Sequence, residues 1–323
     1  MAPKRRVTIA VLDDYQRAAE KFLPLQELRE VCLPELTTYT TPAKDTEELV
    51  ARAGAAEVVI AMRERSRLTA DVLAGLERTR LIVTTGARNA AIDTAAARSR
   101  GIVVCGTRGM DTGPAELSWA LLLALVRRIP EADRGVRIGD WASSVGETLA
   151  GKTLGVVGLG TIGRQVAEYG KAFGMRVLAS SRSLSPELAA ILGVDRVSRE
   201  RLFREADVVT LHIPLTADTA GFVGARELGW MKRTAYLVNT ARGGLVDQSA
   251  LESALTDGLI RGAALDVYDV EPLPVDSALV GMPNVVLAPH IGYVTEERYT
   301  AYYRQAAEIV RRYVQGIEIR VIN

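Results

Sequence analysis

The sequence predicts an α/β protein with two doubly wound parallel sheets, and three observations support this fold class. Short apolar runs alternate with segments of helical periodicity along most of the 323 residues. The alternation occurs in two series, one before residue 107 and one after residue 153. Hydrophobic residues make up 48% of the chain, which indicates a globular rather than a disordered protein. Repeated βα units at this spacing favour parallel strands with helices on both faces.

The first series fills about the first hundred residues. Its expected strands are Val7–Val11, Val58–Ala61, Leu81–Thr84 and Ile102–Val104. Its expected helices are Tyr15–Arg29, Thr46–Ala53, Thr69–Leu76 and Ile92–Arg98. The apolar segment Leu117–Ile129 then follows Gly113-Pro114, a pair that favours a helix start. This segment is too short to cross a membrane, so we expect a buried helix or a subunit contact.

The second series begins at Thr153 and continues to about Ala288. Its expected strands are Leu154–Gly158, Arg176–Ala179, Asp207–His212, Ala235–Asn239, Gly262–Asp266 and Val285–Leu287. A helix is expected over Glu296–Tyr313 and a short strand over Ile317–Val321. Because αβ segments flank the second series on both sides, we expect it to form a domain inserted into the first one, with a cleft between them.

Three glycines join the first strand of the second series to its first helix. Gly158, Gly160 and Gly163 have the spacing G-x-G-x-x-G, directly after the apolar run 154–157 and before a helical pattern. Gly158 would permit a tight turn, Gly160 would leave room for a pyrophosphate, and Gly163 would let helix and strand pack closely. The order strand, glycines, helix is the context that dinucleotide binding requires, so we predict an NAD or NADP site here.

Three polar residues follow expected strands of the second series, where ligands of parallel sheets bind. They are Arg242, Glu271 and His290, and the chain has only one other histidine, His212. Hydride transfer to a carbonyl needs a proton donor, which a histidine beside a carboxylate provides. It also needs a group that polarises the carbonyl and one that holds the substrate carboxylate, and arginine suits both.

Each of these residues also has a simpler interpretation. Arg242 could be one of many surface arginines, Glu271 could be solvated, and His290 could cap a turn beside Pro289. His212 also ends an expected strand, but no carboxylate motif accompanies it. We therefore favour a structural role, or a place in the wall of the cofactor site, for His212.

These motifs resemble those of the D-isomer-specific 2-hydroxyacid dehydrogenases, and the resemblance covers nearly the whole chain. The matching stretches are Gly158–Gly163, Asp207–Thr216, Asn239–Gly243, Asp266–Pro272 and Pro289–Gly292. The resemblance implies a Rossmann dinucleotide-binding domain (residues 108–292) inserted into a flavodoxin-like substrate or catalytic domain (residues 1–107 and 293–323). It implies that His290 is the general acid/base, that Glu271 pairs with it, and that Arg242 binds and orients the 2-oxo acid.

The resemblance also implies contacts to the nicotinamide cofactor and to the substrate. Asp266 would lie near the nicotinamide carboxamide. The implied substrate contacts are Arg63, Arg242 and the backbone N–H groups of Gly86, Ala87 and Arg88. The implied cofactor contacts are Gly158, Gly160, Thr161, Ile162, Gly163, Ser181, Arg182, His212, Ile213, Pro214, Thr219, Thr240, Ala241, Asp266, His290 and Gly292. The implied assembly is a homodimer with the Leu117–Ile129 helix near the contact.

The choice between NADP and NAD depends on the strand Arg176–Ala179. An Asp or Glu about 20 residues beyond the glycines binds the adenosine ribose in NAD enzymes, whereas this chain has Ser181 and Arg182. Serine with arginine would accept a 2′-phosphate, so the sequence favours NADP over NAD. Arg182 could instead stack on adenine or point to solvent, which leaves NAD open.

The charge of the substrate is open as well. Arg88 stands where the family usually has glycine, and it either turns away or adds a cation to the pocket. The loop Met62–Thr69, which contains Arg63, is similar to the loop of phosphoglycerate dehydrogenases in which arginine meets phosphate. Many of those enzymes carry a C-terminal regulatory domain, and we expect no counterpart of it in this sequence. A phosphorylated or dicarboxylate substrate is thus the alternative to a small 2-hydroxy acid.

Charge and composition exclude several function classes. Forty basic residues nearly balance 39 acidic ones, which argues against nucleic-acid and membrane partners. The N-terminal residues lack the apolar segment of a signal peptide, and Cys32 and Cys105 lack disulfide or metal-ligand spacing, so we expect a cytoplasmic protein without a metal. Formate dehydrogenase activity is disfavoured because formate needs no acid partner such as Glu271. The alternative function is a dinucleotide-sensing, corepressor-like interaction protein on the same scaffold.

Overall fold

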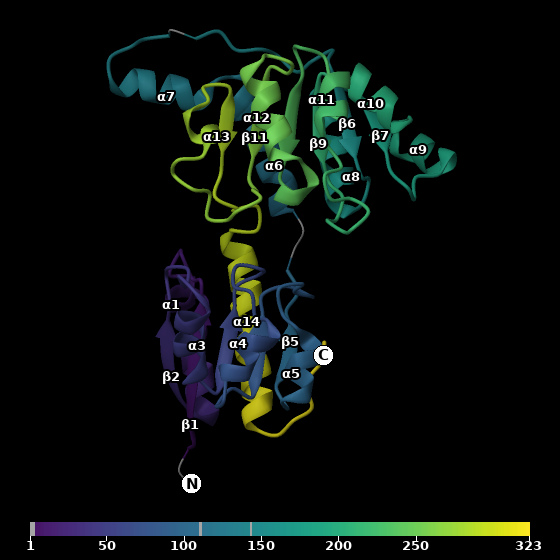
Figure 1. The fold of residues 1–323 in the computed structure, drawn as a ribbon. Helices are drawn as coiled ribbons and strands as arrows, with labels where there is room; N and C mark the ends of the chain where they lie inside the picture. The colour runs from purple at the N-terminus through teal and green to yellow at the C-terminus, as the bar shows by residue number, and fades with distance from the viewer. Residues whose placement is uncertain (1–3, 110–111, 143) are drawn as a thin grey trace. The chain divides into compact units, whose positions relative to one another are not determined.

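The computed structural model describes residues 4–109, 112–142 and 144–323. The chain divides into two compact units (Figure 1). Unit 1 comprises Met1–Met110 with Val294–Asn323, and unit 2 comprises Asp111–Tyr293, so unit 2 is inserted into unit 1 along the chain. Each unit contains one parallel sheet, of five strands in unit 1 and seven in unit 2. The predicted fold class is therefore confirmed.

Unit 1 has the strand order β2-β1-β3-β4-β5, which is the flavodoxin-like order. The strands are β1 (Arg6–Leu12), β2 (Leu33–Thr38), β3 (Val58–Ala61), β4 (Leu81–Thr84) and β5 (Val103–Gly106). The helices are α1 (Ala18–Phe22), α2 (Leu25–Val31), α3 (Thr46–Gly54), α4 (Ala70–Gly75), α5 (Thr94–Ser99) and α14 (Glu296–Val314). Helix α14 packs with α1 and α2, while α3, α4 and α5 pack with one another.

Three details of unit 1 differ from the sequence prediction. The expected helix Tyr15–Arg29 is two helices, because Pro24 between them has no N–H to donate. The strand β2 was not predicted, since its alternating Pro, Glu and Thr residues resemble a loop. The expected strand Ile317–Val321 is wrong: this stretch has no strand pairing. Instead, the N–H of Ile322 donates to the carbonyl of Val104 (2.8 Å) as a single bond.

Unit 2 has the strand order β12-β11-β10-β9-β6-β7-β8, and all neighbouring pairs are parallel. The strands are β6 (Thr153–Val157), β7 (Arg176–Ser180), β8 (Asp195–Arg196), β9 (Val208–Leu211), β10 (Tyr236–Asn239), β11 (Gly262–Leu265) and β12 (Val285–Leu287). Read from β8 to β11, the strands follow the dinucleotide-binding order 3-2-1-4-5-6. The strand β12 is added beyond β11. The order reverses between β6 and β9, so ligands are expected beyond the carboxyl ends of these strands.

The helices of unit 2 surround this sheet (Figure 1). They are α6 (Gly113–Val126), α7 (Ile129–Arg137), α8 (Thr161–Ala172), α9 (Pro186–Leu192), α10 (Arg199–Glu205), α11 (Ala225–Trp230), α12 (Gln248–Thr256) and α13 (Ala278–Gly281), with a 3-10 turn at Gly243–Leu245. The expected single helix Leu117–Ile129 ends earlier, because Arg128 is left-handed (φ 54°) and separates α6 from α7. No helix in the described part of the chain is long and apolar enough to cross a bilayer.

Candidate active site

The turn between β6 and α8 has the geometry that its glycines predict. Gly158 has φ +88°, a left-handed conformation that favours glycine. A Cβ atom added at Gly163 would lie 2.0 Å from the carbonyl oxygen of Gly158, so only glycine lets α8 pack this close to β6. Gly160 is the N-cap of α8, and a Cβ there would meet nothing within 4 Å. The first N–H groups of α8 therefore border open space, where an anion would be stabilised.

The imidazole of His290 and the carboxylate of Glu271 form a pair at the ends of β12 and β11. Nδ1 of His290 lies 2.6 Å from Oε2 of Glu271, and the side chains are 25% and 33% exposed. Burial acts to raise the pKa of Glu271, but the hydrogen bond and the charge of His290 outweigh it and the pKa is lowered. An ionised carboxylate only accepts hydrogen bonds, so Nδ1 carries a proton and Nε2 is left for a ligand.

The backbone after His290 is held by Asp266. Its Oδ1 accepts a hydrogen bond from the N–H of Ile291 (2.8 Å), and its Oδ2 accepts one from Gly292 (2.9 Å). Asp266 is 1% exposed, and burial raises the pKa of its carboxyl while these two bonds oppose the rise. His290 itself has φ +53°, an unfavourable value for a residue with a side chain, so the clamp stabilises an uncommon backbone conformation. The two described hydrogen bonds of the Asp266 carboxylate therefore both go to the backbone that follows His290.

Arg242 follows β10 in a turn folded by the side chain of Asn239. Nδ2 of Asn239 donates to the carbonyl of Arg242 (2.9 Å), and Oδ1 accepts from the N–H of Ala241 (3.1 Å). Nη1 of Arg242 donates to the carbonyl of Ala241 (2.6 Å). The charge of Arg242 also helps to lower the pKa of Glu271, so the two side chains belong to one electrostatic site. The structure thus brings Arg242, Glu271 and His290 together.

Other predicted cofactor residues surround the same edge of the sheet. Thr161 and Ile162 open α8, and Ser181 and Arg182 directly follow β7, where Arg182 is exposed. His212 and Ile213 follow β9; Nε2 of His212 is 2.9 Å from Oγ1 of Thr210, and burial lowers the pKa of His212 to about 4. A neutral, hydrogen-bonded ring is what the structural interpretation of His212 predicts.

Two predicted hydroxyls are engaged within the protein. Thr219 donates to the carbonyl of Pro214 (2.7 Å) and accepts from the N–H of Thr216, so it holds its own turn. Oγ1 of Thr240 lies 2.5 Å from Oγ of Ser118 on α6. Sequence reasoning did not single out Asn239 or Ser118 as functional residues. The available signal for Asn239 is a polar residue at the end of an apolar strand.

The predicted substrate residues of unit 1 also lie near one another. Arg63 follows β3 with φ +52°, and a Cβ added at Gly86 would come within 2.2 Å of its Nη1. Nε of Arg63 is 3.6 Å from Oε2 of Glu64. The guanidinium of Arg65 donates to the carbonyl of Asp13 and lies 4.1 Å from the ring centroid of Tyr15.

Ala87 and Arg88 come directly after Gly86, and both are exposed.

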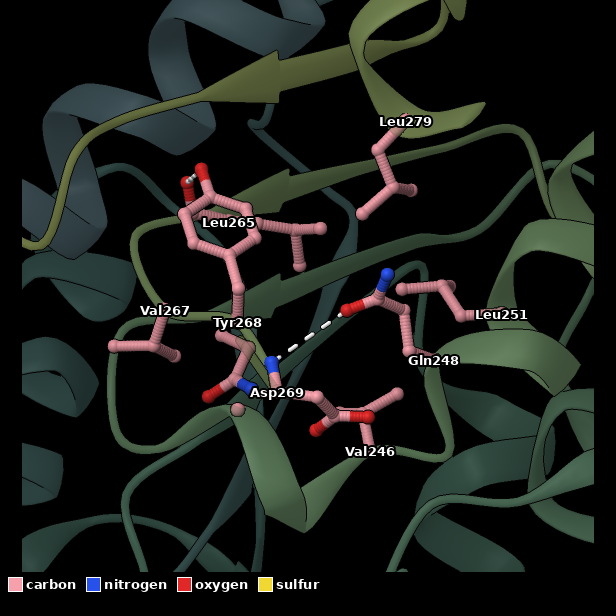
Figure 2. A pocket seen from close by; sticks show the side chains of 10 residues that line it. Val246, Gln248, Leu251, Leu265, Val267, Tyr268, Asp269 and Leu279 are labelled. Atoms are coloured by element: carbon pink, nitrogen blue, oxygen red, sulfur yellow. Dashed lines mark hydrogen bonds between the residues drawn. The ribbon is translucent and has the colours of Figure 1, made fainter. Parts of the chain in front are cut away.

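A pocket is lined by residues that neighbour Arg242 and Glu271 in the sequence, among them Gly243 and Asp269 (Figure 2). It is lined by Asn239, Gly243, Val246, Gln248, Leu251, Leu265, Val267, Tyr268, Asp269 and Leu279. Within the described residues, no group of three or more His, Cys, Asp or Glu side chains is placed to hold a metal ion.

Comparisons with known proteins show the family to which the chain belongs. A family model, D-isomer specific 2-hydroxyacid dehydrogenase, NAD binding domain, matches residues 119–292. A glyoxylate reductase from Aeropyrum pernix is 41% identical over 86% of this chain and 85% of its own length. A D-3-phosphoglycerate dehydrogenase from Methanocaldococcus jannaschii is 38% identical over 96% of this chain, which spans only 58% of that enzyme. The crystal structure of a phosphoglycerate oxidoreductase from Vibrio cholerae has a TM-score of 0.91 at 35% identity, covering 96% of this chain and 99% of that one.

Proposed function

Because the chain belongs to the D-isomer specific 2-hydroxyacid dehydrogenase family, and is therefore an NAD(P)-dependent oxidoreductase, we propose that His290 is its acid/base catalyst. In this proposal the enzyme interconverts a small 2-oxo acid and the corresponding D-2-hydroxy acid. The observation that carries the proposal is the 2.6 Å contact between His290 and Glu271, beside the loop of Arg242. All three residues follow strands of the unit that contains the glycine turn.

The residues of unit 2 fit a dinucleotide. The open N-terminus of α8 at Gly160 would hold the pyrophosphate, since backbone N–H groups and the helix dipole favour anions there. When bound, the nicotinamide supplies or accepts the hydride at C2 of the substrate. Asp266, which we expected near the carboxamide, acts in this proposal through the backbone of Ile291 and Gly292.

The protein's own groups move the proton and orient the substrate. Glu271 accepts a hydrogen bond from Nδ1–H of His290, which directs Nε2 toward the substrate oxygen. In reduction Nε2–H donates its proton to that oxygen, and in oxidation neutral Nε2 takes the proton back. The guanidinium of Arg242 would hold the substrate carboxylate and stabilise the negative charge that develops on the oxygen.

The partners of Arg63 and Arg65 favour a substrate without a second anionic group. Arg63 faces Glu64 at 3.6 Å, and Arg65 is engaged by the carbonyl of Asp13 and the ring of Tyr15. A phosphate would have to compete with these partners and would meet the negative charge of Glu64. We therefore place the substrate among small 2-oxo acids such as glyoxylate or hydroxypyruvate, rather than phosphorylated ones.

Ser181 and Arg182 support NADP as the cofactor. They follow β7, and no carboxylate stands at either position to repel a 2′-phosphate. The exposed guanidinium of Arg182 is available to an anion in that region. NAD is the second candidate, and comparing the two cofactors decides between them.

A homodimer is supported by the apolar segment that follows α7. Ile138, Trp141 and Val145 are 82% to 87% exposed, which is unusual for large apolar side chains at neighbouring positions. A second copy of the chain would cover them, and the contact would begin at α7 rather than at the buried α6. Light scattering of the wild type and of Trp141→Ser tests this contact. Cys32 and Cys105 are buried free thiols, and unpaired cysteines support the proposed cytoplasmic location.

One assay tests the proposed function directly. The protein is mixed with NADPH or NADH and with glyoxylate, hydroxypyruvate or 3-phosphohydroxypyruvate, and the absorbance of the reduced cofactor is followed. We expect consumption with the first two acids, and faster consumption with NADPH. No consumption with any 2-oxo acid, together with tight cofactor binding, would favour the dinucleotide-sensing interaction protein instead.

A further inference from the structure

We infer that Tyr268 is a positioning residue that fixes the geometry of the proposed acid–base site, an inference that rests on the proposed function. Tyr268 follows β11 and is 8% exposed. Its backbone N–H contacts the carboxylate of Glu271 in its own loop. Its backbone carbonyl contacts the loop of Arg242, and its hydroxyl contacts the start of the loop of His290.

The backbone N–H of Tyr268 holds the carboxylate of Glu271. It donates to Oε1 at 3.0 Å, while Oε2 of the same carboxylate faces Nδ1 of His290 at 2.6 Å. One oxygen is thus fixed by the backbone and the other is presented to the imidazole. Because the carboxylate is held at both ends, its orientation toward His290 depends on where the Tyr268 peptide lies.

The carbonyl of Tyr268 sets the distance to the Arg242 loop. A Cβ added at Gly243, the residue after Arg242, would lie 2.0 Å from the carbonyl oxygen and 2.1 Å from the carbonyl carbon of Tyr268. The two backbones therefore touch, and only glycine permits the approach. Any shift of the Tyr268 peptide moves this contact and changes the spacing between Arg242 and Glu271.

The hydroxyl of Tyr268 connects the ends of two strands. It donates to the carbonyl of Ala288 at 2.8 Å and lies 3.2 Å from the carbonyl of Leu265, at the end of β11. Ala288 precedes His290 by two residues, so this bond fixes the start of the loop whose other end Asp266 clamps. Figure 2 shows the ring beside Leu265, in the wall of the pocket.

A phenylalanine would fill the same volume without making this bond. Filling the core alone therefore does not account for a tyrosine here, whereas fixing His290 relative to Glu271 does. Displacing a reacting group by about 1 Å costs up to about 100-fold in rate, so a loosened loop should reduce turnover before it reduces cofactor binding.

The experiment compares Tyr268→Phe with Tyr236→Phe. Tyr236 is a matched control, because it is 7% exposed, lies in the same unit, and donates its hydroxyl hydrogen bond to Glu147 at 2.7 Å. Glu147 lies outside the catalytic loops, so the control removes a comparable bond elsewhere. Turnover is expressed per cofactor-binding site, measured by fluorescence titration of the reduced cofactor, so partial unfolding cannot imitate the effect.

We expect Tyr268→Phe to lower kcat roughly tenfold and to shift the pH profile of kcat/KM, with the cofactor KM unchanged. Tyr236→Phe should lower the melting temperature by a similar amount and leave kcat within about twofold. In a Glu271→Gln background, Tyr268→Phe should cost less than about twofold, because a residue that acts through the pair loses its effect when the pair is broken.

Equal kcat values for Tyr268→Phe and Tyr236→Phe would overturn the inference, as would a full tenfold loss in the Glu271→Gln background. His290→Asn separates this result from the proposed function. If His290→Asn turns over like the wild type, the proposed function fails and takes the inference with it. If His290→Asn is inactive while Tyr268→Phe is normal, only the role of Tyr268 is refuted.

Discussion

The two units share one architecture and differ in what lies at the carboxyl ends of their strands. Each sheet is parallel and reverses its order once, between β1 and β3 in unit 1 and between β6 and β9 in unit 2. In unit 1 the carboxylate of Asp13, directly after β1, is buried and accepts a hydrogen bond from Ser66 (2.6 Å). In unit 2 the pair of His290 and Glu271 keeps a quarter to a third of its side-chain surface exposed.

This difference separates the fold from the chemistry. Polar residues follow strands in both units, as expected for any doubly wound sheet. In unit 1 they are largely bonded to one another, whereas in unit 2 a clamped backbone holds an imidazole and a carboxylate open to a ligand. The following four variants test this contrast, beginning with the largest expected effect.

His290→Asn should abolish the chemistry assigned to unit 2. We expect turnover to fall by about 10²- to 10⁴-fold, because the variant removes the group that we propose transfers the proton. Cofactor affinity, measured by fluorescence titration, should change by less than about threefold, since the glycine turn is untouched. Turnover near that of the wild type would mean that unit 2 does not carry the proposed proton-transfer group, and the contrast between the two units would be lost.

Ser181→Asp should reverse the cofactor preference within unit 2. A carboxylate after β7 would repel a 2′-phosphate and accept hydrogen bonds from a ribose, so we expect KM for NADPH to rise about 30-fold. The KM for NADH should fall or stay the same, and both are read from initial rates at saturating 2-oxo acid. Equal changes with the two cofactors would refute the assignment of Ser181 and Arg182 to the 2′-position.

Glu271→Gln should make the stability of unit 2 less dependent on pH. The pKa of Glu271 is lowered in the folded protein, so the ionised carboxylate stabilises the fold above its ordinary pKa and ceases to do so as pH falls through the lowered value. We expect the variant to lose about 1 kcal/mol near pH 7, allowing for partial exposure, and less near pH 3, because the carboxylate becomes protonated as the pH falls through its lowered pKa. Urea unfolding at both pH values measures the difference, and a loss that is constant with pH would contradict it.

Glu64→Gln should give the smallest change, and it lies in unit 1. Removing the charge that faces Arg63 would free that guanidinium for a second anion on the substrate. We expect kcat/KM for 3-phosphohydroxypyruvate to rise about threefold relative to hydroxypyruvate. Arg67→Gln, in the same loop, serves as the control for the loss of a nearby charge. An unchanged ratio would mean that Arg63 does not face the distal end of the substrate.

The sequence predicted most of the fold because buried parallel strands are continuous apolar runs. Val58–Ala61, Leu81–Thr84 and Val285–Leu287 match the structure residue for residue. Where the structure differed, the local pattern was ambiguous. The edge strand β2 contains Pro34 and Glu35 and gains its identity only from pairing with β1. The tail Ile317–Val321 is apolar enough for a strand, but only the residues after it, Ile322 and Asn323, bond to the segment 102–104, and no strand ladder forms.

The sequence predicted which side chains lie at the candidate site, but it did not predict how they are arranged relative to one another. Arg242, Glu271 and His290 stand after strands, and that position alone brought them to one edge of a sheet. Their mutual geometry depends on contacts between distant parts of the chain, such as the hydroxyl of Tyr268 on the carbonyl of Ala288. No spacing rule encodes such a contact, and the same holds for the carboxylate of Asp266, which the resemblance assigned to the cofactor.

The insertion of unit 2 as one uninterrupted stretch has an evolutionary consequence. The residues proposed to transfer the proton and the glycine turn stay together in any recombination event that preserves residues 111–293. If the proposed function holds, exchanging the flanking segments would change the proposed substrate loops and leave the proposed catalytic residues unaltered. Substrate range can therefore diversify by shuffling the ends of the gene, whereas a breakpoint between β10 and β12 would destroy the reaction itself.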